Sequence, residues 1–219
     1  MNQKLDRSVK RNFWAFFFHG IFLNIAGVFS QITTIQSSFV YLLTGSSLLS
    51  GVLFTANRIG LILPQMFFAP IIQKRRFKKI FLLLAVLIRA VSWLIIGLLT
   101  FFWGQSHPGF VTVTFFAFTL LFFLAGGMGD VTYYDVLAKS IPVGIRGKLF
   151  GWRFFVGGLL SIAAGYLTKI ILGASPDFFR NYGYLFLLTS LSMFIAFFGF
   201  YSLKEPPGQA KTEKKYLRR

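Results

Sequence analysis

The sequence predicts an all-α, polytopic membrane protein with six transmembrane helices, on three observations. The first is composition: the 219-residue chain is 55% hydrophobic, and only 13% of its residues are charged. Soluble domains carry about 25% charged residues, so an ordinary water-facing surface is excluded. The second is a set of six apolar runs, each near the roughly 20 residues that a span requires. The third is that basic residues cluster between these runs. We expect spans over residues 13–35, 48–72, 80–102, 111–139, 149–172 and 182–202.

The charged residues predict the orientation of these spans. The formal net charge is +17, and the basic residues gather in four clusters, at 4–11, 74–79, 139–153 and 204–219. The alternate connections at 36–47, 103–109 and 173–181 carry almost none. Because Lys and Arg in short loops resist translocation, both termini are expected in the cytoplasm and the protein in the cell membrane. Topology explains most of the charge, so no nucleic-acid partner is expected.

The same pattern divides the chain into three parts. Residues 1–12 read as a basic cytoplasmic N-terminus, and residues 13–203 read as the six-helix bundle. Residues 204–219 follow with Glu205-Pro206-Pro207-Gly208 and a polar stretch, which indicates a cytoplasmic tail or a linker.

Small and polar residues recur at helical spacing within the spans. Asn24 belongs to such a stripe in the first span, and Gly151, Gly158 and Gly165 repeat every seven residues in the fifth. These stripes of small and polar residues have two interpretations. Small residues let helices pack closely, within this bundle or against another one, whereas Asn and Gln side chains favour a polar pathway.

Charged side chains within the spans are expensive and usually paired or functional. Matching their depths at about 1.5 Å per residue predicts two ion pairs, Arg89 with Asp130 and Arg153 with Asp135. Asp130 is also a candidate for proton coupling, since burial disfavours a charged carboxylate.

Arg58 has no carboxylate at its predicted depth of roughly 21 Å. We therefore expect a central cavity that contains Arg58, with Asn24, Asn57 and Gln65 near it, because an unpaired guanidinium persists most easily beside water. The alternative is that Arg58 bonds to backbone carbonyls freed by Pro64.

Motifs for catalysis are absent from the sequence. The two histidines, His19 and His107, are far apart, and neither a zincin motif, a Walker glycine loop nor a G-x-S-x-G elbow occurs. The chain has no cysteine, which excludes a disulfide framework, a thiolate metal site and a cysteine nucleophile. We expect no enzymatic activity, no cofactor and no metal.

Two stretches after the fourth apolar run, LAKSIP at 137–142 and RGKLFG at 146–151, resemble the joint between spans four and five of many bacterial major facilitator superfamily transporters. Residues 73–79 fall where that family has its signature loop after span two. There Gln73 replaces the usual Asp, and Arg76 or Phe77 replaces the Gly, so the gating contact of that loop is not carried over.

The resemblance implies the N-terminal half of such a transporter, built from two inverted three-helix repeats. Its expected function is secondary active transport, by symport or antiport, of a small solute through a pathway of which this chain supplies one half. Arg58 favours an anionic solute. The expected partners are the lipid bilayer and either a missing C-terminal bundle or a second copy. A non-transporting scaffold or assembly protein is the alternative, and a membrane enzyme is a third possibility.

Overall fold

The computed structural model describes residues 7–207, and all regular structure in this range is helical. Six segments are long and apolar enough to span a membrane, as the composition predicts. The first, Arg7–Thr44, contains α1 (Arg7–Phe29), the π-helix η1 (Ile32–Gln36) and α2 (Ser37–Thr44). The other five are α3 (Ser47–Gln73), α4 (Lys79–Trp103), α5 (Pro108–Ser140), α6 (Val143–Gly173) and α7 (Phe178–Tyr201).

The first connection differs from the prediction. Residues 36–47 were expected to form a loop, but Ser37–Thr44 are helical, because Phe39 and Val40 are fully buried in the core. The chain turns only at Gly45, whose φ of 69° ends α2 in the left-handed conformation that glycine adopts without strain. Ser46 then caps α3 by accepting a hydrogen bond from the amide of Leu49 at 3.3 Å.

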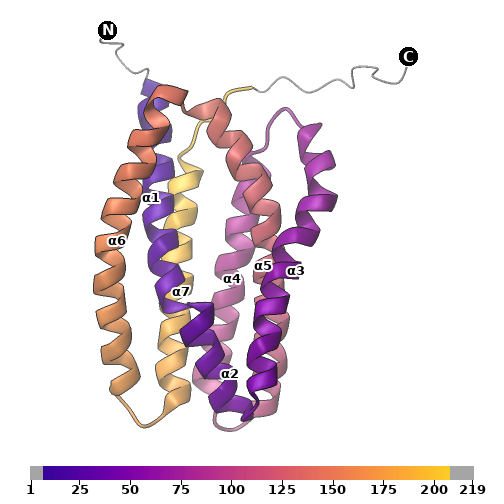
Figure 1. Cartoon of the computed structure of the whole chain (residues 1–219), viewed down its shortest axis with the longest axis vertical. Helices are drawn as coiled ribbons and strands as arrows, with labels where there is room; N and C mark the ends of the chain where they lie inside the picture. The colour runs from indigo at the N-terminus through magenta and orange to yellow at the C-terminus, as the bar shows by residue number, and fades with distance from the viewer. Residues whose placement is uncertain (1–6, 208–219) are drawn as a thin grey trace.

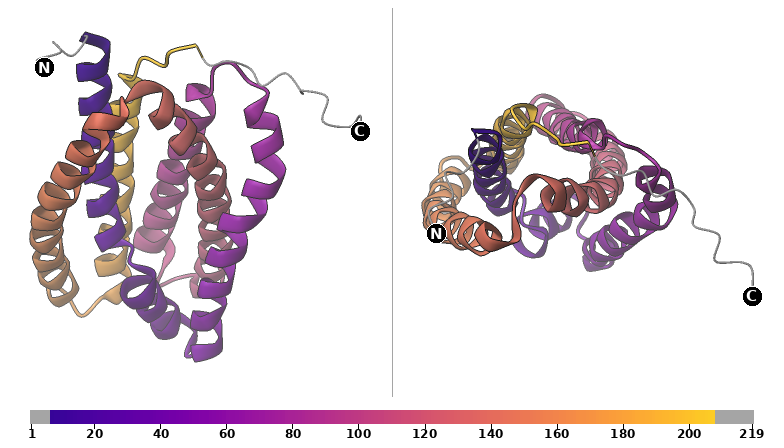
Figure 2. Two further views of the ribbon diagram at one scale, coloured as in Figure 1. Left: turned by 45° about the horizontal axis from the view of Figure 1, so that its top comes forward. Right: turned by 90° about the horizontal axis from the view of Figure 1, so that it is seen from above.

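The six spans form two groups of three that meet side by side (Figures 1 and 2). One group contains α1, α6 and α7, and the other contains α3, α4 and α5. Within the groups α1 packs against α6 and α7, while α5 packs against α3 and α4; α4 and α7 form the largest contact between the groups. The start of α1 and the segment after α7 lie at the same end of the bundle (Figure 1).

Glycines set how closely several helices approach. A Cβ at Gly127 of α5 would overlap the carbonyl oxygen of Leu61 in α3 and lie 3.0 Å from that of Gly60. The two helices therefore touch backbone to backbone, as small residues permit in membranes. Pro64, four residues after Gly60, has no N–H to donate to the Gly60 carbonyl, and α3 is bent in Figure 1.

The main core consists of aromatic side chains from several helices. Trp93 of α4, Phe115 of α5 and Phe186 of α7 are almost fully buried and pack with Phe39 of α2, with ring centroids 5.1–6.4 Å apart. These contacts hold both groups and the short α2 together, and they leave α3 and α6 as the least buried spans.

Candidate functional site

Four helices enclose a polar cavity of about 180 Å³. The polar and charged side chains that line it are His19 of α1, Arg89 of α4, Asp130, Tyr133 and Tyr134 of α5, and Arg153 of α6. The structure thus brings together three of the charged residues predicted from the sequence. It adds His19 and Tyr133, which the sequence did not single out as site residues.

Arg153 reaches the cavity across α1. Its Nη1 donates a hydrogen bond to the Tyr133 hydroxyl at 2.8 Å, and its Nε is buried without a hydrogen-bond partner. A Cβ at Gly20 of α1 would overlap the guanidinium of Arg153, so the missing side chain at position 20 provides its space.

Arg89 and Asp130 line the cavity together but form no salt bridge. The guanidinium carbon of Arg89 lies 4.5 Å from the ring centroid of Phe122, a cation–π contact, and its Nε is buried without a hydrogen-bond partner. Asp130 lines the same cavity and is exposed on the surface of the bundle. The two residues predicted to pair are therefore neighbours, and their charges remain available for other partners.

His19 has one defined orientation. It is buried, its ring stacks on Phe200 of α7 with centroids 3.5 Å apart, and its Nδ1 lies 3.2 Å from the carbonyl oxygen of Ala196. A carbonyl only accepts, so Nδ1 carries a proton and donates a hydrogen bond there, and Nε2 is left without that partner.

The predicted pair of Arg153 with Asp135 is wrong. Asp135 forms a salt bridge with Lys78, just before α4, whereas Arg153 bonds to Tyr133. Tyr133 and Asp135 are two residues apart and so point to different sides of α5. The prediction compared only the depths of the charged residues and did not consider the side of the helix to which each one points.

The cavity that Asn24 lines does not contain Arg58, Asn57 or Gln65. Asn24 packs its amide against Gly157 of α6 and lines a second cavity, of about 610 Å³, between α1 and α6. Arg58, Asn57 and Gln65 lie on α3, which packs against α5. Arg58 is exposed near the middle of its span, and its side chain makes neither a hydrogen bond nor an ion pair with residues 7–207.

The glycines Gly151, Gly158 and Gly165 of α6 face open space. A Cβ at any of the three would have no neighbouring atom within 4 Å. Packing of these three glycines against helices of this bundle is therefore wrong, while packing against another bundle and a place along a polar pathway stay predictions. The close contacts of α6 use Gly157 instead.

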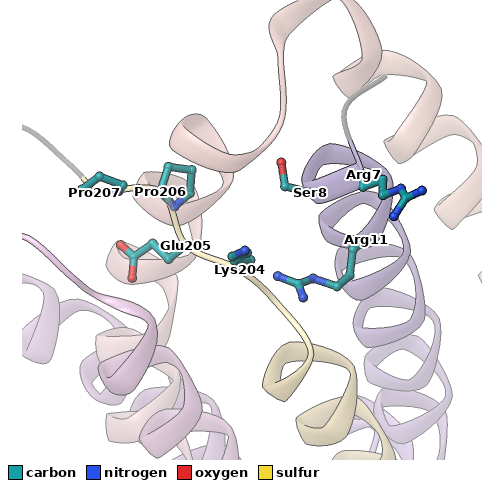
Figure 3. A pocket seen from close by; sticks show the side chains of 7 residues that line it. All are labelled: Arg7, Ser8, Arg11, Lys204, Glu205, Pro206 and Pro207. Atoms are coloured by element: carbon teal, nitrogen blue, oxygen red, sulfur yellow. The ribbon is translucent and has the colours of Figure 1, made fainter. Parts of the chain in front are cut away.

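The segment after α7 is joined to the end of the bundle. The Glu205 carboxylate is almost completely buried, accepts hydrogen bonds from the amides of Lys78 and Lys79 at 2.7–3.0 Å, and forms a salt bridge with Lys139 at 3.2 Å. Asn12 of α1 exchanges two hydrogen bonds with the backbone of Lys204. Figure 3 shows this segment beside the basic start of α1. The expected boundaries at residues 12 and 204 thus fall inside one hydrogen-bonded network; residues 208–219 lie outside the described range.

In the described part of the chain, no three His, Cys, Asp or Glu side chains form a group that could hold a metal ion. Comparisons with family models, with curated proteins and with solved structures found no match to the chain.

Proposed function

We propose that this chain forms one half of the pathway of a secondary active transporter for a small solute. The observation that carries the proposal is Asp130, which lines the polar cavity and is exposed on the surface of the bundle. It lies ten residues before the end of α5, or about 15 Å from that end, and thus near the middle of a bilayer core of about 30 Å. A carboxylate exposed at this depth is costly in lipid, so water or another protein surface covers it.

The charge of the cavity favours an anionic solute. Arg89 and Arg153 bring two positive charges against the single negative charge of Asp130, and the exposed Arg58 adds another on α3. In a region of low dielectric constant this excess attracts an anion and repels a cation. The Nε atoms of Arg89 and Arg153, which have no hydrogen-bond partner among residues 7–207, are donors that a carboxylate or phosphate could satisfy.

The helix contacts support a bundle of two three-helix repeats, as in the major facilitator superfamily. If α1, α3 and α4 form one repeat and α5, α6 and α7 form the other, then α1 corresponds to α5, α3 to α6 and α4 to α7. The contact of α1 with α6 then has its equivalent in the contact of α5 with α3. The contact of α1 with α7 has its equivalent in the contact of α5 with α4. A pathway built this way needs a second bundle, supplied by a further chain segment or by a second copy.

A non-transporting scaffold or assembly protein is the second candidate. The open glycines Gly151, Gly158 and Gly165 favour it as much as they favour a transporter, because either one would dock another helix on them. The two functions differ in whether water reaches Asp130.

The absence of cysteine allows a direct test of that difference. In the Asp130→Cys variant, assayed in native membranes, we expect reaction with a charged, water-soluble methanethiosulfonate reagent. Leu87→Cys is the matched control: Leu87 is exposed on α4 at a depth of about 12 Å, and a lipid-facing thiol there should stay unlabelled. Labelling of neither position would contradict an aqueous pathway and favour the scaffold.

Transport itself is tested in proteoliposomes by recording currents or uptake with a panel of mono- and dicarboxylates and matched amines. We expect signals with anions that fall at least about tenfold in Arg153→Gln and persist in Leu87→Ala, since a mid-membrane charge that contacts solute dominates its binding. If no solute of the panel gave a current or measurable uptake, the result would contradict the transport proposal.

A further inference from the structure

A groove separate from the polar cavity runs between α1 and α6, at the end of the bundle where the described chain begins and ends. Its volume is about 670 Å³, and it shares no lining residue with the polar cavity. Most of its wall is apolar, with Phe13, Trp14 and Phe17 on α1 and Trp152 on α6, and its two charged members are Lys10 and Lys148. Figure 1 shows the two helices beside each other along this length.

The two walls of the groove present the same order of side chains. Both contain Lys-x-x-x-Trp, as Lys10 to Trp14 on α1 and as Lys148 to Trp152 on α6. Residues four apart lie on the same face of a helix, with the lysine about 6 Å nearer the end of the bundle. Lysine at the headgroup level with tryptophan just below it is the order that a membrane interface favours. Trp14 and Trp152 are 53% and 50% exposed, so the groove is open to the bilayer.

The two lysines have no anionic partner within residues 7–207. The ion pairs there join Asp135 to Lys78, Glu205 to Lys139 and Asp177 to Arg180, which are all outside the groove. Two ammonium groups that line one groove therefore lack a counter-charge from the described residues.

We propose that this groove binds one anionic phospholipid. Its phosphate lies between Lys10 and Lys148, and an acyl chain lies along Phe13, Phe17 and the two tryptophans. A chain already in lipid gains little by moving onto an apolar wall, so the selectivity comes from the headgroup charge. Each lysine near an anionic headgroup contributes about a fivefold increase in affinity. The site is independent of the proposed transport function.

The tryptophans of the groove supply the measurement. The chain has four tryptophans; Trp93 is fully buried, and Trp103 lies at the other end of the bundle and is replaced by Phe in all variants. The protein is reconstituted in phosphatidylcholine vesicles with a small fraction of brominated phosphatidylglycerol or, for comparison, brominated phosphatidylcholine. We expect the anionic lipid to quench the fluorescence of Trp14 and Trp152 more strongly than phosphatidylcholine does. In the double variant Lys10→Gln/Lys148→Gln, this preference for the anionic lipid should fall by about fivefold for each lysine removed.

The control variant is Arg75→Gln/Arg76→Gln, which removes the same charge at the same end of the bundle from the connection between α3 and α4. It should keep the preference. Equal losses in both double variants would mean general surface attraction and would overturn the proposal, as would an unchanged preference in Lys10→Gln/Lys148→Gln. Displacement of the quenching lipid by soluble glycerol phosphate would mean a site for a free anion and would also overturn it. Quenching by brominated phosphatidylcholine, which should be equal in all variants, verifies that the fold is retained.

Discussion

At the scale of single residues, Gly20 decides whether Arg153 can enter the polar cavity. The guanidinium occupies the place that a side chain at position 20 would take, and from there it reaches the Tyr133 hydroxyl at 2.8 Å. A hydrogen bond to a charged donor contributes about 1.5–3 kcal/mol, more than a neutral one. The absence of a side chain at Gly20 thus permits the hydrogen bond between Arg153 and Tyr133.

Gly20→Ala should therefore displace Arg153 and lower the free energy of unfolding by about 1–3 kcal/mol, the usual cost of overpacking. Thermal unfolding in detergent, followed by tryptophan fluorescence, measures the change. Gly27→Ala is the control on the same helix, because a Cβ there meets no atom within 4 Å. If both variants melted at the same temperature, the steric role of Gly20 would be refuted.

The sequence identifies some residues of this cavity and misses others for a physical reason. Arg89, Asp130 and Arg153 stand out because a charge within an apolar run is costly wherever it points. His19 and Tyr133 carry no such signal, since a single histidine or tyrosine in a membrane helix has many ordinary roles. Arg58 stands out equally but lies on α3, away from the cavity. The sequence shows how deep a charged residue lies in its span and that burying it is costly, but it does not show which helices are neighbours.

At the scale of helices, the start of α4 is held by a residue from the other end of the chain. The first amides of a helix lack partners within it, and Glu205 accepts from those of Lys78 and Lys79 while pairing with Lys139. The carboxylate also lies at the positive end of the helix dipole. Glu205 therefore joins the segment after α7 to α4 and to the end of α5.

Glu205→Gln should loosen this junction, because an amide side chain carries no charge and offers one acceptor oxygen instead of two. We expect the free energy of unfolding to fall by about 1–2 kcal/mol, the range measured for helix caps. Hydrogen exchange should accelerate at the start of α4. Asp177→Ala, which removes the side-chain cap of α7, should accelerate exchange at Phe179 and Arg180 instead. The same exchange pattern in both variants would contradict a local role for Glu205.

The helices themselves were largely predictable. The bilayer fixes a minimum length for each apolar run, so the predicted spans at 48–72, 80–102 and 111–139 differ from α3, α4 and α5 by at most three residues at either end. The predicted starts of α6 and α7 were six and four residues late. A whole helix was missed at α2, because its sequence, SSFVYLLT, is short and polar at its start. The burial of Phe39 and Val40 that makes it helical comes from other helices. Tertiary packing of this kind leaves no local pattern.

At the scale of the whole molecule, the bundle has one well-packed side and two helices with little cover. The contact of α4 with α7 joins the two groups, while α3 and α6 remain the least buried spans. Exposed Arg58 lies on α3 and the open glycines lie on α6. Lipid suits neither feature well: a charge there is costly, and a row of glycines leaves backbone close to the surface. A second bundle would cover both.

We expect that bundle to be a second copy when the chain is expressed alone. If the glycine face of α6 meets its own copy, thiols introduced there come within the 4.4–6.8 Å Cα separation that a disulfide needs. Gly158→Cys should then form a cross-linked dimer in oxidised membranes, with Gly151→Cys and Gly165→Cys behaving alike because they share its face. Leu160→Cys is the matched control, exposed on the same helix but about 200° around it. Monomer in all three glycine variants would exclude a second copy at this face and leave a different chain or segment as the covering partner.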